Sequence, residues 1–136
     1  MASATLIEKR RKAIAILMEL AETDLQVIRQ VISRQIAAFR KSDAIAAFAE
    51  AAPGIQQQFG TAENFAAMVE AAYPSVYRPR SVVFESIQMV EGLPTQQVML
   101  MDRGGRLLRA TYMMQQQADG DWKIAGCYLT PMGYEE

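Results

Sequence analysis

The chain has 136 residues, of which 51% are hydrophobic and 21% are charged, and its formal net charge is -1. This length and composition predict one domain with its own core, and they argue against intrinsic disorder and against a broad nucleic-acid-binding surface. The chain contains no histidine and a single cysteine, Cys127. A Ser-His or Cys-His nucleophile pair and an intramolecular disulfide are therefore excluded, and no specifically bound zinc, iron or other cofactor is expected.

The N-terminal stretch Glu8–Leu20, EKRRKAIAILMEL, joins a basic cluster to a short apolar segment. This order imitates a secretion signal, but Glu19 interrupts the apolar segment and no A-x-A cleavage pattern follows. The segment is also shorter than the ~20 apolar residues that span a bilayer, and it lacks the aromatic anchors of a helix lying on a membrane surface. We predict a retained helical extension over residues 1–22, no transmembrane segment and a cytoplasmic location.

A helical region comes next. Apolar residues recur at intervals of three and four from Leu25 to Phe39, the spacing that forms one stripe of a helix. Ser42 or Asp43 can cap a second, short helix, and the Pro53-Gly54 pair is predicted to end it.

A third helix is predicted to begin after Thr61, which can act as its N-cap. It must stop near Tyr73, because the ring of Pro74 disfavours helical geometry in the residue before it. Between the second and third helices, the segment Gly54–Gly60 is expected to add one short strand.

After Pro79 the pattern changes to strands, separated by the turn-forming sequences EGLP, DRGG and ADGD. Short polar links of this kind join antiparallel neighbours, so a meander is predicted. Helices followed by an antiparallel sheet indicate an α+β fold in which the helices cover one face of the sheet. The domain is predicted to extend over residues 23–136, with strands at Ser81–Val90, Thr95–Met101, Arg106–Gln117 and Trp122–Leu129.

Three stretches carry a resemblance to a known family: FAEAAPGIQQQFGTAENFAAMV, YPSVYRPRSV and ADGDWKIAGCYL. In this order they resemble the bacterial family of domains of unknown function numbered 4864, from about Asp24 to Leu129. The resemblance implies a nuclear-transport-factor-2-like, or ketosteroid-isomerase-like, cone, in which N-terminal helices pack in a strongly curved antiparallel sheet and leave a pocket at one end. That superfamily includes isomerases, dehydratases, binding proteins and interaction modules, so the fold does not fix the function. Members of the closer family often start with a secretion signal, which makes the periplasm the alternative location.

The segment VYRPR, residues 76–80, joins the third helix to the first long strand. In a cone of this kind it lies near the rim, where Tyr73, Tyr77, Arg78 and Arg80 can meet the polar end of a ligand. The alternative, which we favour, is that the arginines cap helix carbonyls or pair with acids while the tyrosines fill the seam between helices and sheet.

Glu85 is a carboxylate inside an apolar run. Strict alternation places it on one sheet face with Val83 and Ile87. If that face lines the pocket, Glu85 is a candidate general base or acid, because burial raises a carboxylate pKa. If it is the outer face, or if a β-bulge shifts the alternation, Glu85 is ion-paired or solvated, and we expect Arg80 or Arg109 to lower its pKa.

The later strands supply the remaining pocket candidates. Tyr112 shares one face of the third strand with Leu108, Ala110 and Met114, and strict alternation puts Trp122 and Tyr128 on one face of the last strand, together with Ile124 and Gly126. Both faces of the sheet are partly apolar. We therefore expect helices on the inside and a homodimer formed through the outer sheet face.

The leading functional hypothesis is a non-catalytic domain that binds an apolar or amphipathic small molecule, or a protein partner. The alternative is a cofactor-free isomerase or lyase that uses Glu85 with Tyr112 or Tyr128, and a third class is a purely structural interaction module. A pocket that contains a buried Glu85 would favour the enzyme, a pocket lined by apolar and tyrosine groups would favour the binder, and a filled cone would favour the interaction module.

Overall fold

The structure, a computed structural model, describes residues 5–12 and 22–132. Residues 5–12 are helical. The rest of the predicted extension and the last four residues lie outside the described residues, so the division into an extension over 1–22 and a domain over 23–136 stays a prediction.

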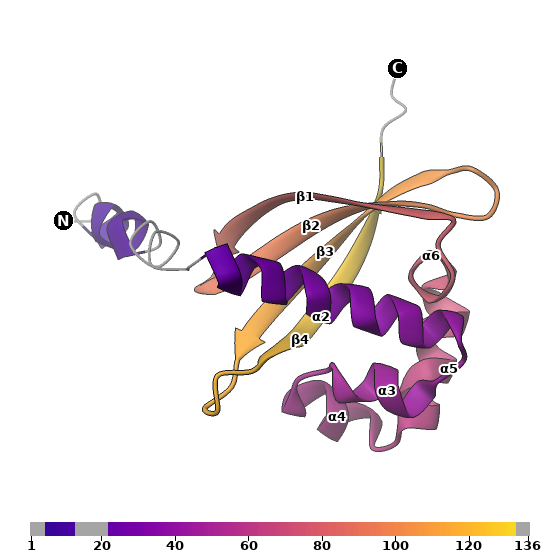
Figure 1. Ribbon diagram of the computed structural model, residues 1–136. Coiled ribbons are helices and arrows are strands. Elements are labelled where there is room, and N and C mark those ends of the chain that lie inside the picture. Colours follow the sequence, from indigo (N-terminus) through magenta and orange to yellow (C-terminus); the bar gives the residue numbers. More distant parts are fainter. Residues whose placement is uncertain (1–4, 13–21, 133–136) are drawn as a thin grey trace.

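The longest helix, α2 (Glu22–Arg40), runs along the concave side of the sheet (Figure 1). Its predicted apolar stripe is confirmed, because Ile28, Ile32, Ile36 and Phe39 are all buried. The opposite side of the helix carries the charged and polar residues, as in other helices that cover a core.

Four shorter helices follow α2: α3 (Ala44–Ala49), α4 (Pro53–Phe59), α5 (Ala62–Ala72) and α6 (Pro74–Tyr77). Two predicted caps are confirmed, because Asp43 Oδ1 accepts a hydrogen bond from the Ala46 N–H at 3.1 Å and Thr61 Oγ1 accepts one from the Asn64 N–H at 3.1 Å. The predicted end of the third helix near Tyr73 is also confirmed, since α5 ends at Ala72.

The segment expected to form a short strand, Gly54–Gly60, is instead helical, and that prediction was wrong. Pro53 occupies the first turn of α4, where its fixed φ suits a helix and its missing N–H costs no hydrogen bond. Proline and glycine therefore begin a helix here and do not simply end the one before it. Gly60, at φ 77°, ends α4 in a conformation that favours glycine.

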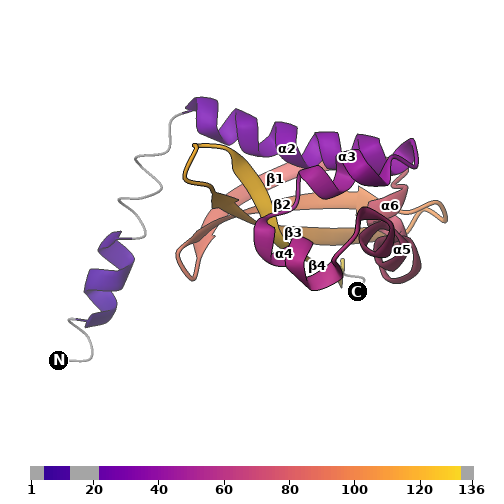
Figure 2. The same cartoon turned by 90° about the horizontal axis from the view of Figure 1, so that it is seen from below.

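The sheet has four antiparallel strands in the order β1-β2-β3-β4, which confirms the predicted meander. The strands are β1 (Ser81–Val90), β2 (Leu93–Met101), β3 (Leu107–Gln116) and β4 (Trp122–Pro131). Helices α2–α6 gather on the concave side of the curled sheet (Figures 1 and 2). The α+β architecture with helices packed in a curved antiparallel sheet is thus confirmed.

The connection between α3 and α4 joins the edge of the sheet. Ala51 forms a parallel bridge with Ile124 of β4. The Ala52 N–H donates to the Ile124 carbonyl at 2.8 Å, and the Ile124 N–H donates to the Glu50 carbonyl at 2.9 Å. This short pairing gives hydrogen-bond partners to some of the backbone N–H and C=O groups on the free edge of β4. It also holds the short helices against β4.

Two β-bulges interrupt the sheet, one in β1 and one in β4. In β1 the register shifts between Phe84 and Ile87, and the buried side chain of Gln96 donates to the freed carbonyls of Glu85 and Ser86 at 2.9 and 3.3 Å. A bulge adds a residue and reverses which side chains point inward beyond it.

The second bulge lies where Met113 pairs with Gly126 but Met114 pairs with Ile124, which leaves Ala125 as the extra residue of β4. Gly126 follows it, and a Cβ atom there would lie 2.6 Å from the Met113 Cε atom. The strand direction is kept, but the inward and outward positions of β4 exchange after residue 125.

Candidate functional site

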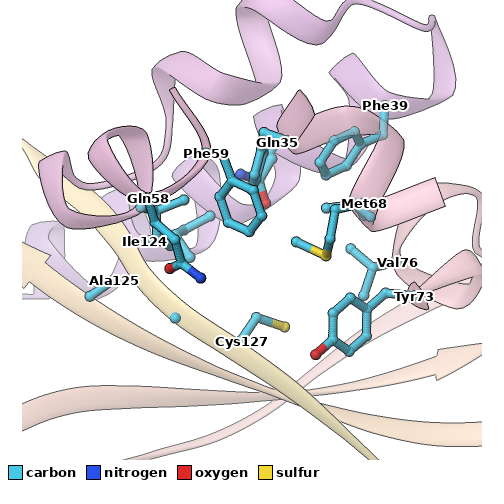
Figure 3. Close-up of a pocket in the computed structure, with 14 residues that line it drawn as sticks. Gln35, Phe39, Gln58, Phe59, Met68, Tyr73, Val76, Ile124, Ala125 and Cys127 are labelled. Carbon is cyan, nitrogen blue, oxygen red and sulfur yellow. The ribbon is translucent and has the colours of Figure 1, made fainter. Parts of the chain in front are cut away.

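A cavity of about 460 Å³ lies between the short helices and β4 (Figure 3). Its volume falls within the ~300–1,000 Å³ typical of small-molecule sites. Four parts of the chain supply the lining: Gln35 and Phe39 from α2; Ile55, Gln58 and Phe59 from α4; Phe65, Met68, Val69, Tyr73 and Val76 from α5, α6 and their junction; and Ile124, Ala125, Gly126 and Cys127 from β4.

The lining is mainly aliphatic and aromatic. Phe65 is its aromatic centre, because its ring lies 5.5 Å from that of Phe48, 5.6 Å from that of Phe59 and 5.8 Å from that of Phe39. Among the described residues that line the cavity, none carries a charge. A ligand that enters the cavity would therefore leave water for an apolar and uncharged environment.

Gln35 is the most deeply buried polar residue of the lining, with 3% of its surface exposed. Its Nε2 donates to the Ala47 carbonyl of α3 at 3.1 Å. This bond fixes the orientation of the amide, because the nitrogen can donate and the oxygen can only accept. Figure 3 shows the side-chain oxygen pointing toward the space between Phe59 and Met68.

Cys127 points into the cavity because the bulge at Ala125 reverses the alternation of β4. Burial raises the pKa of the Cys127 thiol to about 12, although contact with Tyr112 acts in the opposite direction. The thiol is therefore protonated near neutral pH and is a poor nucleophile.

Tyr112 lies behind Cys127 as its cross-strand partner. The side chain is fully buried, and within the described part of the chain its hydroxyl makes no hydrogen bond of ordinary geometry. Burial raises the pKa of Tyr112 well above its usual value, and the neighbouring Cys127 adds to the effect. The phenol thus stays protonated and does not itself line the cavity.

Of the residues that the sequence suggested at a ligand's polar end, Tyr73 lines the cavity and the others lie elsewhere. Tyr77 is buried beside it, with its ring 5.4 Å from that of Phe39. Tyr77 therefore belongs to the seam between helices and sheet, as the favoured alternative predicted.

Arg78 does not reach the cavity, because it caps the end of α2. Its guanidinium donates to the Arg40 carbonyl and, at 2.8 Å, to the Ser42 hydroxyl, and it lies 5.1 Å from the centre of the Tyr77 ring. Arg40 in turn donates to the Pro79 carbonyl at 2.7 Å. Arg78 and Arg40 thus tie the VYRPR segment to the end of α2, and the capping alternative is confirmed for Arg78.

Arg80 is exposed at the start of β1, and its backbone N–H donates to the Met101 carbonyl at 2.7 Å. Trp122 is buried at the other end of the sheet, where its indole N–H is 3.5 Å from Asp24 Oδ1. Trp122 lines a second, more polar hollow of about 270 Å³ beside Arg34 and Lys123.

Glu85 lies on the outer sheet face, away from the cavity. Arg109 Nε donates to Glu85 Oε1 at 2.9 Å and Arg109 Nη2 to Oε2 at 3.3 Å. The hydrogen bonds from Arg109 lower the Glu85 pKa against the opposing effect of burial. The bulge in β1 puts Glu85 and Ile87 on opposite faces of the sheet, so the strict alternation predicted for this strand was wrong. The predicted ion pair between Glu85 and Arg109 is confirmed.

Tyr128 also departs from the expected face. Strict alternation grouped it with Trp122 and Ile124, which are buried, but Tyr128 follows the bulge and is 48% exposed on the outer face. Cys127 takes the inward position in its place. The prediction for β3 is confirmed, because Leu108, Ala110, Tyr112 and Met114 are all buried.

The sequence reasoning missed Gln35, Phe59 and Met68 as cavity residues. A signal for Gln35 was present, because it lies three residues after Ile32 and four before Phe39 on the buried stripe of α2. A polar side chain on such a stripe requires a partner inside the protein. Phe59 and Met68 could not be singled out, since apolar helix residues usually fill a core.

Over residues 5–12 and 22–132, no group of three or more acidic, cysteine or histidine residues could hold a metal ion. Within the same ranges, no helix combines the length and apolar content needed to cross a bilayer. The cellular compartment stays a prediction.

A family model described as a domain of unknown function, DUF4864, matches residues 21–135. This match confirms the family suggested by the three sequence stretches. The chain matches no curated protein. It also matches no solved structure, so the nuclear-transport-factor-2-like cone stays a prediction.

Proposed function

The chain belongs to the family of domains of unknown function DUF4864, and from this premise we propose that it binds an uncharged, largely apolar small molecule without converting it. The site is the cavity between α4, α5 and β4. The observation that supports this most directly is an apolar lining, free of charged residues, around a volume of about 460 Å³. Binding would bury apolar ligand surface at ~25 cal/mol per Å².

Binding without chemistry is favoured by the protonation states of nearby groups. A general base near neutral pH needs a pKa close to that pH, but burial raises the pKa of Cys127 to about 12 and that of Tyr112 well above its usual range. Glu85, the carboxylate of the isomerase or lyase alternative, is held by Arg109 on the other side of the sheet. The geometry gives that alternative no support.

A fluorescence titration tests the proposal. N-phenylnaphthylamine is uncharged and apolar, and its emission rises in a dry site, so we expect saturable binding to the full chain. Met68→Glu places a charge in the cavity and should weaken binding by at least about tenfold, because burying an unpaired charge is costly. Ile45→Glu puts the same charge at an exposed position of α3 that does not line the cavity, and it serves as the matched control. Absence of saturable binding, or equal binding by both variants, would refute the proposal.

We also propose a homodimer formed through the outer sheet face. Val83 and Tyr128 are 47% and 48% exposed on this face, and Met99 and Met113 lie among them in the paired strands. An apolar sheet surface of this kind is usually covered in solution. The Glu85–Arg109 pair at its centre can face its own copy across a two-fold axis.

Sedimentation velocity at tens of micromolar protein decides the second proposal. We expect a dimer for the unmodified chain, dissociation in Tyr128→Glu, and a retained dimer in Gln57→Glu, which changes an exposed residue of α4. A monomer at every concentration would exclude this interface.

A further inference from the structure

We infer that Gln35 makes the cavity selective for ligands that carry a hydroxyl or N–H donor at the buried end, such as an apolar alcohol or phenol, over carboxylates and esters of the same length. This inference rests on the proposed small-molecule binding and names the ligand class for that same site.

The first step is the fixed orientation of the Gln35 amide. Nε2 donates to the Ala47 carbonyl at 3.1 Å, and the whole residue is buried. The reversed amide would set its oxygen against the Ala47 carbonyl oxygen and place two acceptors in contact. The observed orientation is therefore enforced by α3, and Oε1 is presented on the other side.

The second step is that Oε1 is available. Within residues 5–12 and 22–132, no N–H, O–H or S–H group donates a hydrogen bond to this oxygen, although Gln35 lines the cavity. In Figure 3 the oxygen lies on the side of the amide that faces Phe59 and Met68, two other residues of the lining. A ligand that fills the cavity would cut the oxygen off from water, and an amide oxygen left without a donor in this way is costly. A ligand that supplies a donor therefore gains what an ester or a hydrocarbon cannot.

The third step excludes anions. A carboxylate at this depth would lose its hydration, and among the described residues of the lining there is no lysine or arginine to replace it. Oε1 of Gln35, the most deeply buried polar residue of the lining, would repel it. Cys127 offers at most a weak S–H donor. An uncharged donor is thus the polar group that matches the site.

Competition experiments test the inference on the full chain. Decanol, methyl decanoate and decanoic acid share their alkyl chain and differ in the terminal group, and each would be used to displace N-phenylnaphthylamine at about pH 8, where the acid is ionised. We expect decanol to bind about tenfold more tightly than the ester, and the acid to be the weakest, because an unmade buried hydrogen bond costs roughly that factor.

Gln35→Met keeps the length of the side chain and removes the acceptor, so the preference for decanol over methyl decanoate should fall to about one while the ester still binds. Gln58→Met changes a polar lining residue at the exposed edge of the cavity and should keep the preference. Because each preference is a ratio measured within one variant, a general loss of stability does not imitate it. If Gln35→Met does not fold, the series on the unmodified chain still decides.

Equal displacement by alcohol, ester and acid would overturn the selectivity and leave the binding cavity standing. Failure of the fluorescent compound and of all three competitors to bind would overturn the cavity proposal as well.

Discussion

The two ends of the concave sheet face are covered in different ways. Along the first half of α2, Ile28, Val31 and Ile32 are at most 1% exposed and belong to the same buried cluster as Val98 and Leu100. At this end a single helix, α2, which has 19 residues, packs its apolar stripe against the strands.

At the other end, α4 and α5 have 7 and 11 residues and leave the cavity open against β4. Met68 and Phe59 are only partly buried there. Two short helices joined by a tight turn cover the sheet less completely than one long helix, because each has fewer side chains on the face that it turns toward the sheet. The continuous apolar stripe of α2 thus produces close packing against the sheet, whereas the interrupted pattern of α4 and α5 leaves room for a ligand.

The largest expected effect compares one residue from each end. Ile32→Ala should lower the free energy of unfolding by about 2–5 kcal/mol, because it creates a cavity in a close-packed region. Met68→Ala should cost less than about 2 kcal/mol, because this side chain is half-buried and already faces an open space. Urea unfolding of both variants measures the difference. Equal losses would mean that the two ends are packed alike in solution.

The second prediction concerns alkaline pH at the cavity end. The Cys127 thiol ionises near 9.0 when unfolded, whereas burial raises its folded pKa to about 12. Between these two values the folded state holds a proton that the unfolded state has lost. The stability that the protonated Cys127 contributes is therefore fully present below about pH 9 and is lost as the pH rises toward 12. The full difference corresponds to at most ~4 kcal/mol, at 1.36 kcal/mol per pH unit.

Urea unfolding at a series of pH values would show the decline, and Cys127→Ala should make it shallower. Part of the slope should remain, because burial raises the pKa of Tyr112 in the same direction. Identical pH dependence of the two proteins would show that the thiol is not buried in solution.

The smallest effect is expected on the outer face. Glu85→Gln should lower the free energy of unfolding by ~0.2–1 kcal/mol, the range of partly exposed ion pairs. The Glu85 pKa is lowered from 4.5 by its bonds to Arg109, so this contribution is present above pH 4.5 and is lost as the pH falls through the folded pKa. NMR titration of the carboxylates gives the pKa directly. A value at or above 4.5 would contradict the ion pair and return Glu85 to the catalytic candidates.

Much of the fold could be predicted because it depends on local signals. The stripe of α2, the caps Asp43 and Thr61, and the turns of the meander each require only neighbouring residues. The segment 53–59 was the exception, since proline suits both the end of one helix and the start of the next.

The site was less predictable because its geometry comes from tertiary contacts. Gln35 receives its orientation from Ala47, which is 12 residues away. The inward position of Cys127 depends on how β4 pairs with β3, and the bulge in β1 is held by Gln96 from the neighbouring strand. The alternation of residues along a strand therefore predicts which sheet face each side chain takes only as far as the first β-bulge.

The extra residue of β4, Ala125, has a consequence for comparing relatives of this chain. It changes the parity of the strand, so the same column of an alignment can describe an interior position in one relative and a surface position in another. A relative of the same length whose strand pairs without the bulge would place the counterpart of Tyr128 over the cavity and that of Cys127 on the outside, whereas a relative that lacks residue 125 would keep the pairing seen here. Substitutions at these two columns are therefore comparable only between chains whose β4 pairs with β3 in the same way, and equal sequence length does not by itself mean that the same residue lines the cavity.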